Sequence, residues 1–284
     1  MADSPLVTSS WLRGKLGEPH VVVADVRWYL KDKRGIDAYK AGHIPSAVFV
    51  DVDRDLSSPP GPGRPGRHPL PSPEQFADLL ARIGFVRDDL VVAYDDTGGS
   101  TAARLWWLFK YFGLDGGRVL DGGLQAWVAS GYPLETASAL RSVAPRMTLV
   151  PSLDLVVDKK RVREMSERGE GLLLDARASE RFEGRIEPID ARPGHIPGAK
   201  NAPFTDNLSA PGGVFRTKSE LERHYAALGA ATARPIVAYC GSGVTACQDL
   251  LALAIAGRND ALLYEGSWSE WASDVSLPAA SGKS

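Results

Sequence analysis

Cys240 has the sequence surroundings of a reactive thiol. It follows an apolar run at 236–239 that predicts a β-strand, and it precedes a glycine-rich stretch and a predicted helix at 245–255. A thiol between the end of a strand and the start of a helix faces backbone N–H groups and the positive end of the helix dipole, and both favour the thiolate. Gly241 and Gly243 allow the backbone to curl into an anion-binding nest. The pattern predicts nucleophilic sulfur chemistry at Cys240.

Two other interpretations of this cysteine can be weighed from the sequence. A cysteine at a strand end is often simply a small core residue. A phosphatase would need an arginine six residues after the cysteine to hold the phosphate with its planar guanidinium group, and Ala246 stands there instead. Cys247, two helical turns on, is expected to pack in the core, with a redox role as the less favoured alternative. Two cysteines do not make a disulfide framework.

The elements that must position Cys240 occur twice in the chain. Short apolar runs alternate with helical patterns, which is typical of an open, mostly parallel sheet with helices on both faces. Asp95 in the first copy stands where Cys240 stands in the second. Four landmarks recur in the same order: residues 21–27 match 172–177, residues 41–47 match 193–199, residues 91–95 match 236–240, and residues 120–127 match 264–271.

The repeat predicts two tandem α/β domains of ordinary size. The first domain, residues 1–135, is expected to be catalytically silent because Asp95 offers a carboxylate where the second copy has its thiol. Residues 136–151 have little periodicity and are predicted to be a linker, and residues 152–284 are predicted to form the catalytic domain. Within the first domain we expect strands at 21–26, 90–94 and 119–120, helices at 73–82, 101–112 and 124–130, and an irregular proline-rich stretch at 57–73.

The loop that begins at Cys240 resembles a known active-site loop. The run Cys-Gly-Ser-Gly-Val-Thr at 240–245 resembles that of the 3-mercaptopyruvate sulfurtransferases, within the tandem-rhodanese superfamily. The likeness extends over nearly the whole chain, because the Gly-His-Ile-Pro turns at 42–45 and 194–197, the Asp-Gly-Gly stretch at 121–123 and the Glu-Gly-Ser-Trp stretch at 265–268 also fit. It implies two rhodanese-like domains and a sulfur atom carried on the cysteine. Gly241 and Ser242 are uncharged, whereas thiosulfate-preferring members tend to carry basic residues there, so 3-mercaptopyruvate is favoured as the donor.

The resemblance also implies residues that bind the substrate. Arg181, in an Arg-Phe pair, matches the family arginine that holds the substrate carboxylate. The second family arginine lies shortly before the Gly-His-Ile-Pro turn, where this chain is two residues shorter and an ungapped match falls on Asp190. The second clamp is therefore left open between Arg192 and Arg185. The loop residues expected to contact the substrate are Gly241, Gly243, Val244 and Thr245.

A polar trio implied by the family consists of Asp53, His68 and Ser242. Such a trio would polarise the substrate carbonyl, because cleavage of the C–S bond leaves a pyruvate enolate that needs a proton or electrostatic support. The alternative is a hydrogen-bonded bridge with no catalytic part. His43 and His195 are expected to brace their Gly-His-Ile-Pro turns.

The predicted reaction is a two-step, covalent sulfur transfer. Cys240 takes sulfur from 3-mercaptopyruvate and passes it to a thiol or to cyanide, with a thioredoxin-like protein as one candidate acceptor. The resemblance implies no metal or organic cofactor. Alternatives are a thiosulfate:cyanide sulfurtransferase and a single-turnover persulfide carrier that docks on one protein partner.

The composition limits which binding partners and which cellular compartment we expect for the protein. The formal net charge of −2 gives no reason to expect nucleic-acid binding or an anionic membrane partner, and the sequence has no apolar run long enough to span a bilayer. The first residues carry no basic and apolar signal pattern, so we expect a cytoplasmic protein.

Overall fold

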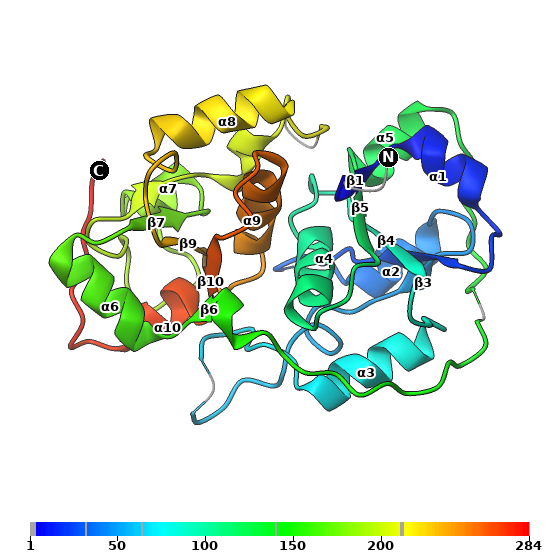
Figure 1. The fold of residues 1–284 in the computed structure, drawn as a ribbon, viewed down its shortest axis with the longest axis horizontal. Helices are drawn as coiled ribbons and strands as arrows, with labels where there is room; N and C mark the ends of the chain where they lie inside the picture. The colour runs from blue at the N-terminus through cyan, green and yellow to red at the C-terminus, as the bar shows by residue number, and fades with distance from the viewer. Residues whose placement is uncertain (1–3, 32, 64, 140, 211–212, 284) are drawn as a thin grey trace. The chain divides into compact units, whose positions relative to one another are not determined.

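The computed structural model describes residues 4–31, 33–63, 65–139, 141–210 and 213–283. Its strands form two five-stranded sheets, and the strand pairs within each sheet are parallel. Helices pack on these sheets (Figure 1). The predicted α/β fold with two mostly parallel sheets is therefore confirmed.

Contacts divide the chain into two compact units, and both units are discontinuous in sequence. The first unit comprises Met1–Ser58, Leu70–Ser152 and Leu208–Phe215. The second unit comprises Pro59–Pro69, Leu153–Asn207 and Arg216–Ser284. The proline-rich segment Pro59–Pro69 is thus part of the unit that carries Cys240.

The first unit is built on a sheet with strand order β1-β5-β4-β2-β3. Its central strands are uninterrupted apolar runs whose side chains are mostly buried, as expected for parallel strands covered on both faces. Helix α4 packs along β4 and β5. The elements are β1 (Leu6–Val7), α1 (Ser9–Lys15), β2 (Val21–Asp25), α2 (Gly35–Ala41), β3 (Val48–Phe49), α3 (Pro73–Arg82), β4 (Leu90–Tyr94), α4 (Ala102–Tyr111), β5 (Gly117–Leu120) and α5 (Gly123–Ala129).

The second unit repeats this arrangement with strand order β6-β10-β9-β7-β8. Helix α9 packs along β9 and β10 in the way that α4 packs in the first unit. The elements are the 3-10 turn η1 (Leu153–Leu155), β6 (Val156–Val157), α6 (Lys159–Arg168), β7 (Leu172–Asp175), α7 (Ser179–Phe182), β8 (Lys200–Asn201), the 3-10 turn η2 (Phe204–Asn207), α8 (Lys218–Ala227), β9 (Ile236–Tyr239), α9 (Ala246–Ile255), β10 (Leu262–Tyr264) and α10 (Ser267–Ser273).

The boundaries follow local sequence signals. Helix α3 begins with Pro73 after Ser72, whose hydroxyl accepts the Gln75 N–H at 3.2 Å. Helix α8 begins with a capping box between Thr217 and Glu220. The helices and strands predicted for the first domain are confirmed to within two residues at each end.

A buried ion pair recurs at the same position of both units. Arg177 donates to both carboxylate oxygens of Asp175 at the end of β7, with a shortest distance of 2.6 Å, and also to Gly194 O at 2.7 Å. Arg27 makes the equivalent bonds to Asp25 in the first unit. The pair ties the end of a central strand to the Gly-His-Ile-Pro turn.

The histidines of these turns are buried and stacked on aromatic rings. His195 stacks on Phe182 with ring centroids 3.7 Å apart, and its Nδ1 bonds to Phe182 O at 2.7 Å. His43 stacks on Tyr39 and bonds to Tyr39 O in the same way. Burial lowers the pKa of His195 below its ordinary value. The expectation that these histidines brace the turns is confirmed.

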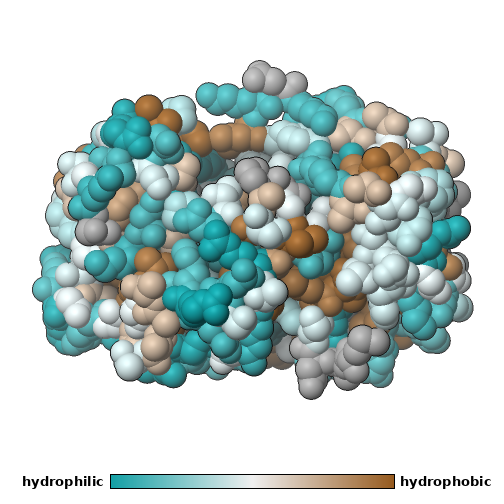
Figure 2. All heavy atoms as spheres, turned by 90° about the horizontal axis from the view of Figure 1, so that it is seen from above, coloured by the Kyte–Doolittle hydropathy of each residue, from teal (hydrophilic) through white to brown (hydrophobic). Residues whose placement is uncertain are grey.

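The surface seen in Figure 2 is mostly hydrophilic or intermediate in hydropathy, with hydrophobic atoms gathered in patches. Individual large apolar side chains, such as Val143 and Val275, are exposed. Of the helices in the described part of the chain, none has the length and apolarity needed to cross a membrane.

Candidate functional site

Cys240 lies directly after β9 in the second unit and is only 2% exposed. This is the carboxyl end of the sheet, where ligands bind in open α/β folds. The Gly243 N–H points at the thiol, with nitrogen and Sγ 3.2 Å apart. Such a contact favours negative charge on the sulfur.

The backbone on both sides of Cys240 is tied to the start of α10. Ser267 Oγ accepts the Cys240 N–H at 3.1 Å, and Cys240 O accepts the Trp268 N–H at 3.0 Å. Gly241 O accepts the Ser269 N–H at 2.9 Å. The Gly-Ser-Trp stretch at 266–268, which matches Gly122 and Gly123 of the first repeat, therefore serves to fix the cysteine loop.

Gly243 is required by the shape of the loop. Its φ is +78°, in the left-handed region, and a Cβ added there would lie 2.6 Å from Glu265 O. Val244 is buried and Thr245, which precedes α9, is partly exposed. Cys247 on α9 is fully buried, and its thiol donates to Gly243 O at 3.4 Å.

The structure brings His68 and Ser242 together. His68 Nδ1 and Ser242 Oγ lie 2.7 Å apart, and both side chains are buried. His68 belongs to the segment Pro59–Pro69 of the second unit. The third residue of the expected trio, Asp53, belongs to the first unit, where its Oδ2 accepts the indole N–H of Trp28 at 2.9 Å.

Two arginines lie beside Gly241. A Cβ built on Gly241 would lie 3.2 Å from Arg67 Nη2 and 3.5 Å from Arg181 Nη1. Arg181 was expected here from the sequence and Arg67 was not. Arg67 is held in place because its N–H donates to Ser269 Oγ at 3.0 Å and because the preceding Gly66 packs against the backbone of Gly266.

Both arginines are paired with buried carboxylates. Asp190 bridges them: its Oδ1 accepts from Arg67 Nη1 at 2.5 Å and its Oδ2 from Arg181 Nη2 at 2.9 Å. Glu187 Oε1 also accepts from Arg181 Nη2, at 2.8 Å. Burial raises the pKa of Glu187, but hydrogen bonds from the Asp190 N–H and from Arg181 outweigh it, and the pKa falls below its ordinary value.

The other two candidate arginines have different partners. Arg192 donates to four backbone carbonyls in and after α10, those of Trp271, Ala272, Asp274 and Leu277. The Arg185 side chain is 57% exposed and pairs with Glu183 at 2.7 Å and Glu180 at 3.7 Å. Arg192 thus ties down the chain end, and Arg185 forms surface ion pairs. Both remain candidates from the sequence alone.

The corresponding loop of the first unit is filled by a carboxylate. Asp95 follows β4 and is fully buried. Its Oδ1 accepts the N–H groups of Thr97 and Gly99, and its Oδ2 accepts those of Thr101 and Ala102, all at 2.8–2.9 Å. The nest that faces Cys240 in the second unit is here occupied by the protein's own anion.

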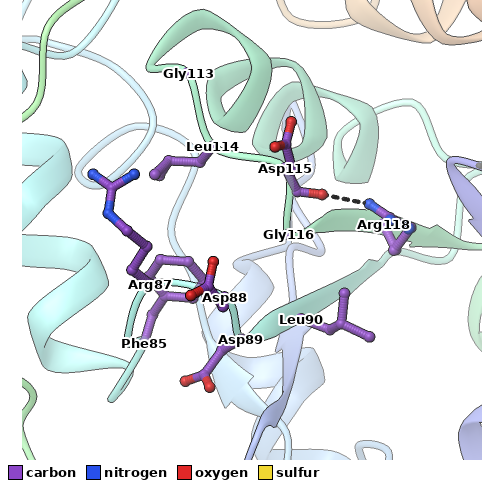
Figure 3. Close-up of a pocket in the computed structure, with 10 residues that line it drawn as sticks. All are labelled: Phe85, Arg87, Asp88, Asp89, Leu90, Gly113, Leu114, Asp115, Gly116 and Arg118. Carbon is purple, nitrogen blue, oxygen red and sulfur yellow. Dashed lines mark hydrogen bonds between the residues drawn. The ribbon is translucent and has the colours of Figure 1, made fainter. Parts of the chain in front are cut away.

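A pocket in the first unit lies at the opposite end of its sheet (Figure 3). It is lined by residues of the loops that lead into β4 and β5, such as Arg87 and Asp88, and by the first residues of these strands, such as Arg118. Nη1 of Arg118 donates to Asp115 O at 2.7 Å. Amino ends of parallel strands are not where α/β folds bind ligands. We therefore place the candidate site at the Cys240 loop.

Comparison with known proteins identifies relatives along the whole chain. The model of the Rhodanese-like domain matches residues 8–130 and 158–274. A probable 3-mercaptopyruvate sulfurtransferase of Pseudomonas aeruginosa is 44% identical, with 99% of this chain and 100% of that protein covered. A putative thiosulfate sulfurtransferase, SseB of Mycobacterium tuberculosis, is 41% identical, with 98% and 97% covered.

A solved structure is also similar to this chain over most of its length. SseA from Escherichia coli, described as a 3-mercaptopyruvate sulfotransferase with the rhodanese fold, superposes with a TM-score of 0.81 at 33% identity. The match covers 94% of this chain and 100% of that one.

Proposed function

Because the chain belongs to the rhodanese family, with two rhodanese-like domains, we propose that it transfers sulfur from 3-mercaptopyruvate to a thiol or to cyanide through a persulfide on Cys240. Sulfurtransferase activity is common to its full-length relatives. The observation that carries the choice of residue is the 3.2 Å contact from the Gly243 N–H to Cys240 Sγ at the carboxyl end of β9. The same contact would stabilise the Cys240 thiolate both when it attacks the donor and when it leaves the persulfide.

The first half-reaction forms the persulfide. The Cys240 thiolate attacks the sulfur of 3-mercaptopyruvate, an S–S bond forms, and the C–S bond breaks. The electron pair of that bond passes to carbon as the enolate of pyruvate, which takes up a proton. Ser242 Oγ, 2.7 Å from His68 Nδ1, is suited to donate a hydrogen bond to the substrate carbonyl as charge develops on it. Asp53 is kept as the third member of the trio on the strength of the family resemblance.

The second half-reaction restores the thiolate. An acceptor thiolate or cyanide attacks the outer sulfur of the persulfide, and Cys240 leaves as the thiolate. The sulfur is oxidised from the thiol to the sulfane level and the carbon that carried it is reduced to the methyl group of pyruvate, so the cycle needs no external oxidant or reductant. A thioredoxin-like protein is one candidate acceptor.

Arg181 and Arg67 are the groups that we assign to the substrate carboxylate. Nη2 of Arg67 and both Nη atoms of Arg181 lie near Gly241, next to the nucleophile. Planar guanidinium groups bind carboxylates through charge-assisted, directional hydrogen bonds. Thiosulfate is the second candidate donor, because the same two groups would also bind a sulfur oxyanion.

Steady-state kinetics with both donors and cyanide as the common acceptor test the proposal. We expect many pyruvate molecules per Cys240 and a larger kcat/KM for 3-mercaptopyruvate than for thiosulfate. The opposite ratio would make the protein a thiosulfate sulfurtransferase. Release of a single equivalent of pyruvate, even with excess acceptor, would indicate a persulfide carrier.

A further inference from the structure

The charges around the Cys240 loop are balanced by carboxylates of the protein. Arg67 and Arg181 lie beside Gly241. They are paired with Asp190 and Glu187, whose side chains are 2% and 3% exposed. We call these four residues the paired cradle. Its two positive charges are matched by two negative charges.

The neighbouring Arg177 adds no unpaired positive charge to the cradle. Glu187 also lies 3.4 Å from Arg177, but Arg177 is itself paired with Asp175 at 2.6 Å. The extended network therefore contains three arginines and three carboxylates. A donor that enters this site meets oriented N–H groups but little net positive potential.

Asp190 is the residue that gives the cradle its geometry. Its two oxygens hold Nη1 of Arg67 and Nη2 of Arg181. Near Gly241 lie Nη2 of Arg67, which Asp190 does not hold, and both Nη atoms of Arg181, of which Nη1 is the closer. By bonding to both arginines, the Asp190 carboxylate fixes the two guanidinium groups beside the nucleophile loop.

We propose that Asp190 determines donor specificity: it orients Arg67 and Arg181 and cancels part of their charge, so that the site accepts a monoanionic carboxylate donor and discriminates against a dianionic sulfur donor. The inference rests on the proposed function, because it concerns the donor of that reaction. A monoanion needs two directed hydrogen bonds, which the arginines supply. A dianion also needs net positive charge to offset the loss of its hydration, and the paired cradle does not supply that charge.

The test is the ratio of kcat/KM for thiosulfate to kcat/KM for 3-mercaptopyruvate, measured with cyanide at low and high salt. Asp190→Asn keeps the side-chain size and adds one unit of net charge. We expect this ratio to rise roughly tenfold at low salt. The reason is that the added positive charge attracts the second negative charge of thiosulfate, which 3-mercaptopyruvate lacks, across a partly solvated site. The rise should shrink at high salt because the added charge is screened.

Glu180→Gln is the matched control. It makes the same change in formal charge on the same segment, but Glu180 is an exposed partner of Arg185. Its ratio should stay within twofold of that of the wild type. Asp190→Glu, which keeps the charge, should stay closer to the wild-type ratio than Asp190→Asn. If Asp190→Asn does not fold, Glu187→Gln removes the same charge from the cradle and should shift the ratio in the same direction.

An unchanged ratio in the folded Asp190→Asn protein, or an equal rise in Glu180→Gln, would overturn the inference. Either result would leave the proposed function intact, since the wild type would still turn over 3-mercaptopyruvate. Failure of the proposed function is a different result, seen in the wild type alone: it would prefer thiosulfate, stop after one pyruvate, or transfer sulfur from neither donor.

Discussion

Asp95→Ala tests whether a buried carboxylate holds together the loop of the first unit that corresponds to the Cys240 loop. In the native protein the Asp95 carboxylate accepts four backbone N–H groups, those of Thr97, Gly99, Thr101 and Ala102, at 2.8–2.9 Å. The side chain is fully buried. Alanine would leave these four donors without their acceptor in a nest shaped around an anion.

The loss in free energy of unfolding can be bounded from these contacts. A hydrogen bond to a charged group contributes roughly 1.5–3 kcal/mol, so four would suggest a very large loss. Water entering the emptied nest and the rehydration of the carboxylate in the unfolded state both reduce it. A buried donor left without an acceptor costs about 1–3 kcal/mol, so with water satisfying part of the four we expect Asp95→Ala to lose roughly 3–5 kcal/mol.

Thermal unfolding followed by calorimetry measures this loss. For a unit of about 150 residues, roughly 2–4 °C per kcal/mol predicts a decrease in the midpoint of the first unit by roughly 6–20 °C. Asp115→Ala, which removes an exposed carboxylate of the same unit, should change it little. Sulfur transfer well below the transition should be nearly unaffected, because Cys240 lies in the second unit. A loss below about 1 kcal/mol would refute the view that Asp95 satisfies the nest.

Three further variants concern the second unit. Arg181→Ala should lower kcat/KM for 3-mercaptopyruvate by roughly 10- to 150-fold, mostly through KM, because the substrate carboxylate keeps its charge throughout C–S cleavage. Arg181→Lys should recover only part of this loss. Kinetics within twofold of the wild type would show that Arg181 does not bind the substrate. Gly243→Ala should lower transfer at least tenfold because its Cβ would lie 2.6 Å from Glu265 O and shift the N–H that faces the thiol; wild-type rates would show that the loop adapts. Ser242→Ala should lower kcat roughly 100-fold with little change in KM, as expected for the loss of a hydrogen bond made mainly in the transition state. A raised KM with unchanged kcat would instead show that Ser242 and its partner His68 act in substrate binding.

The parts of the fold that sequence predicts are those with local causes. The apolar runs of β4 and β9 and the proline at the start of α3 are visible without a structure, because burial on both faces and helix capping each leave a mark on neighbouring residues. The repeat adds long-range information, since it aligns Asp95 with Cys240. For these reasons the two sheets and the place of the cysteine loop were predictable.

The arginines show where such reasoning ends. Arg67 lies in a proline-rich segment without periodicity, and its role depends on contacts with Ser269 and Asp190, more than a hundred positions away in the chain. The one local signal was its place next to His68, which the family resemblance had already singled out. Arg192 looked like a candidate from its place before the Gly-His-Ile-Pro turn, yet its partners are carbonyls that only the folded chain brings near.

The exchange of segments between the units was equally invisible in sequence. Pro59–Pro69 belongs with the second unit and Leu208–Phe215 with the first. Composition marks the proline-rich segment as irregular, but it does not say which sheet an irregular segment packs against. The residues of 136–151 likewise carry contacts of the first unit, such as the bond from the Ala144 N–H to Ala81 O at 2.9 Å.

The central claim is that Cys240 carries the transferred sulfur, and intact-protein mass spectrometry tests it most directly. The protein is treated with one equivalent of 3-mercaptopyruvate without acceptor, and released pyruvate is measured in the same sample. The wild type and Cys247→Ala should each gain the mass of one sulfur atom, release one pyruvate, and lose the added mass when cyanide is supplied. Cys240→Ser should do none of these while keeping its fold. Sulfur gain in Cys240→Ser, or pyruvate release by the wild type without any gain of mass, would contradict the account.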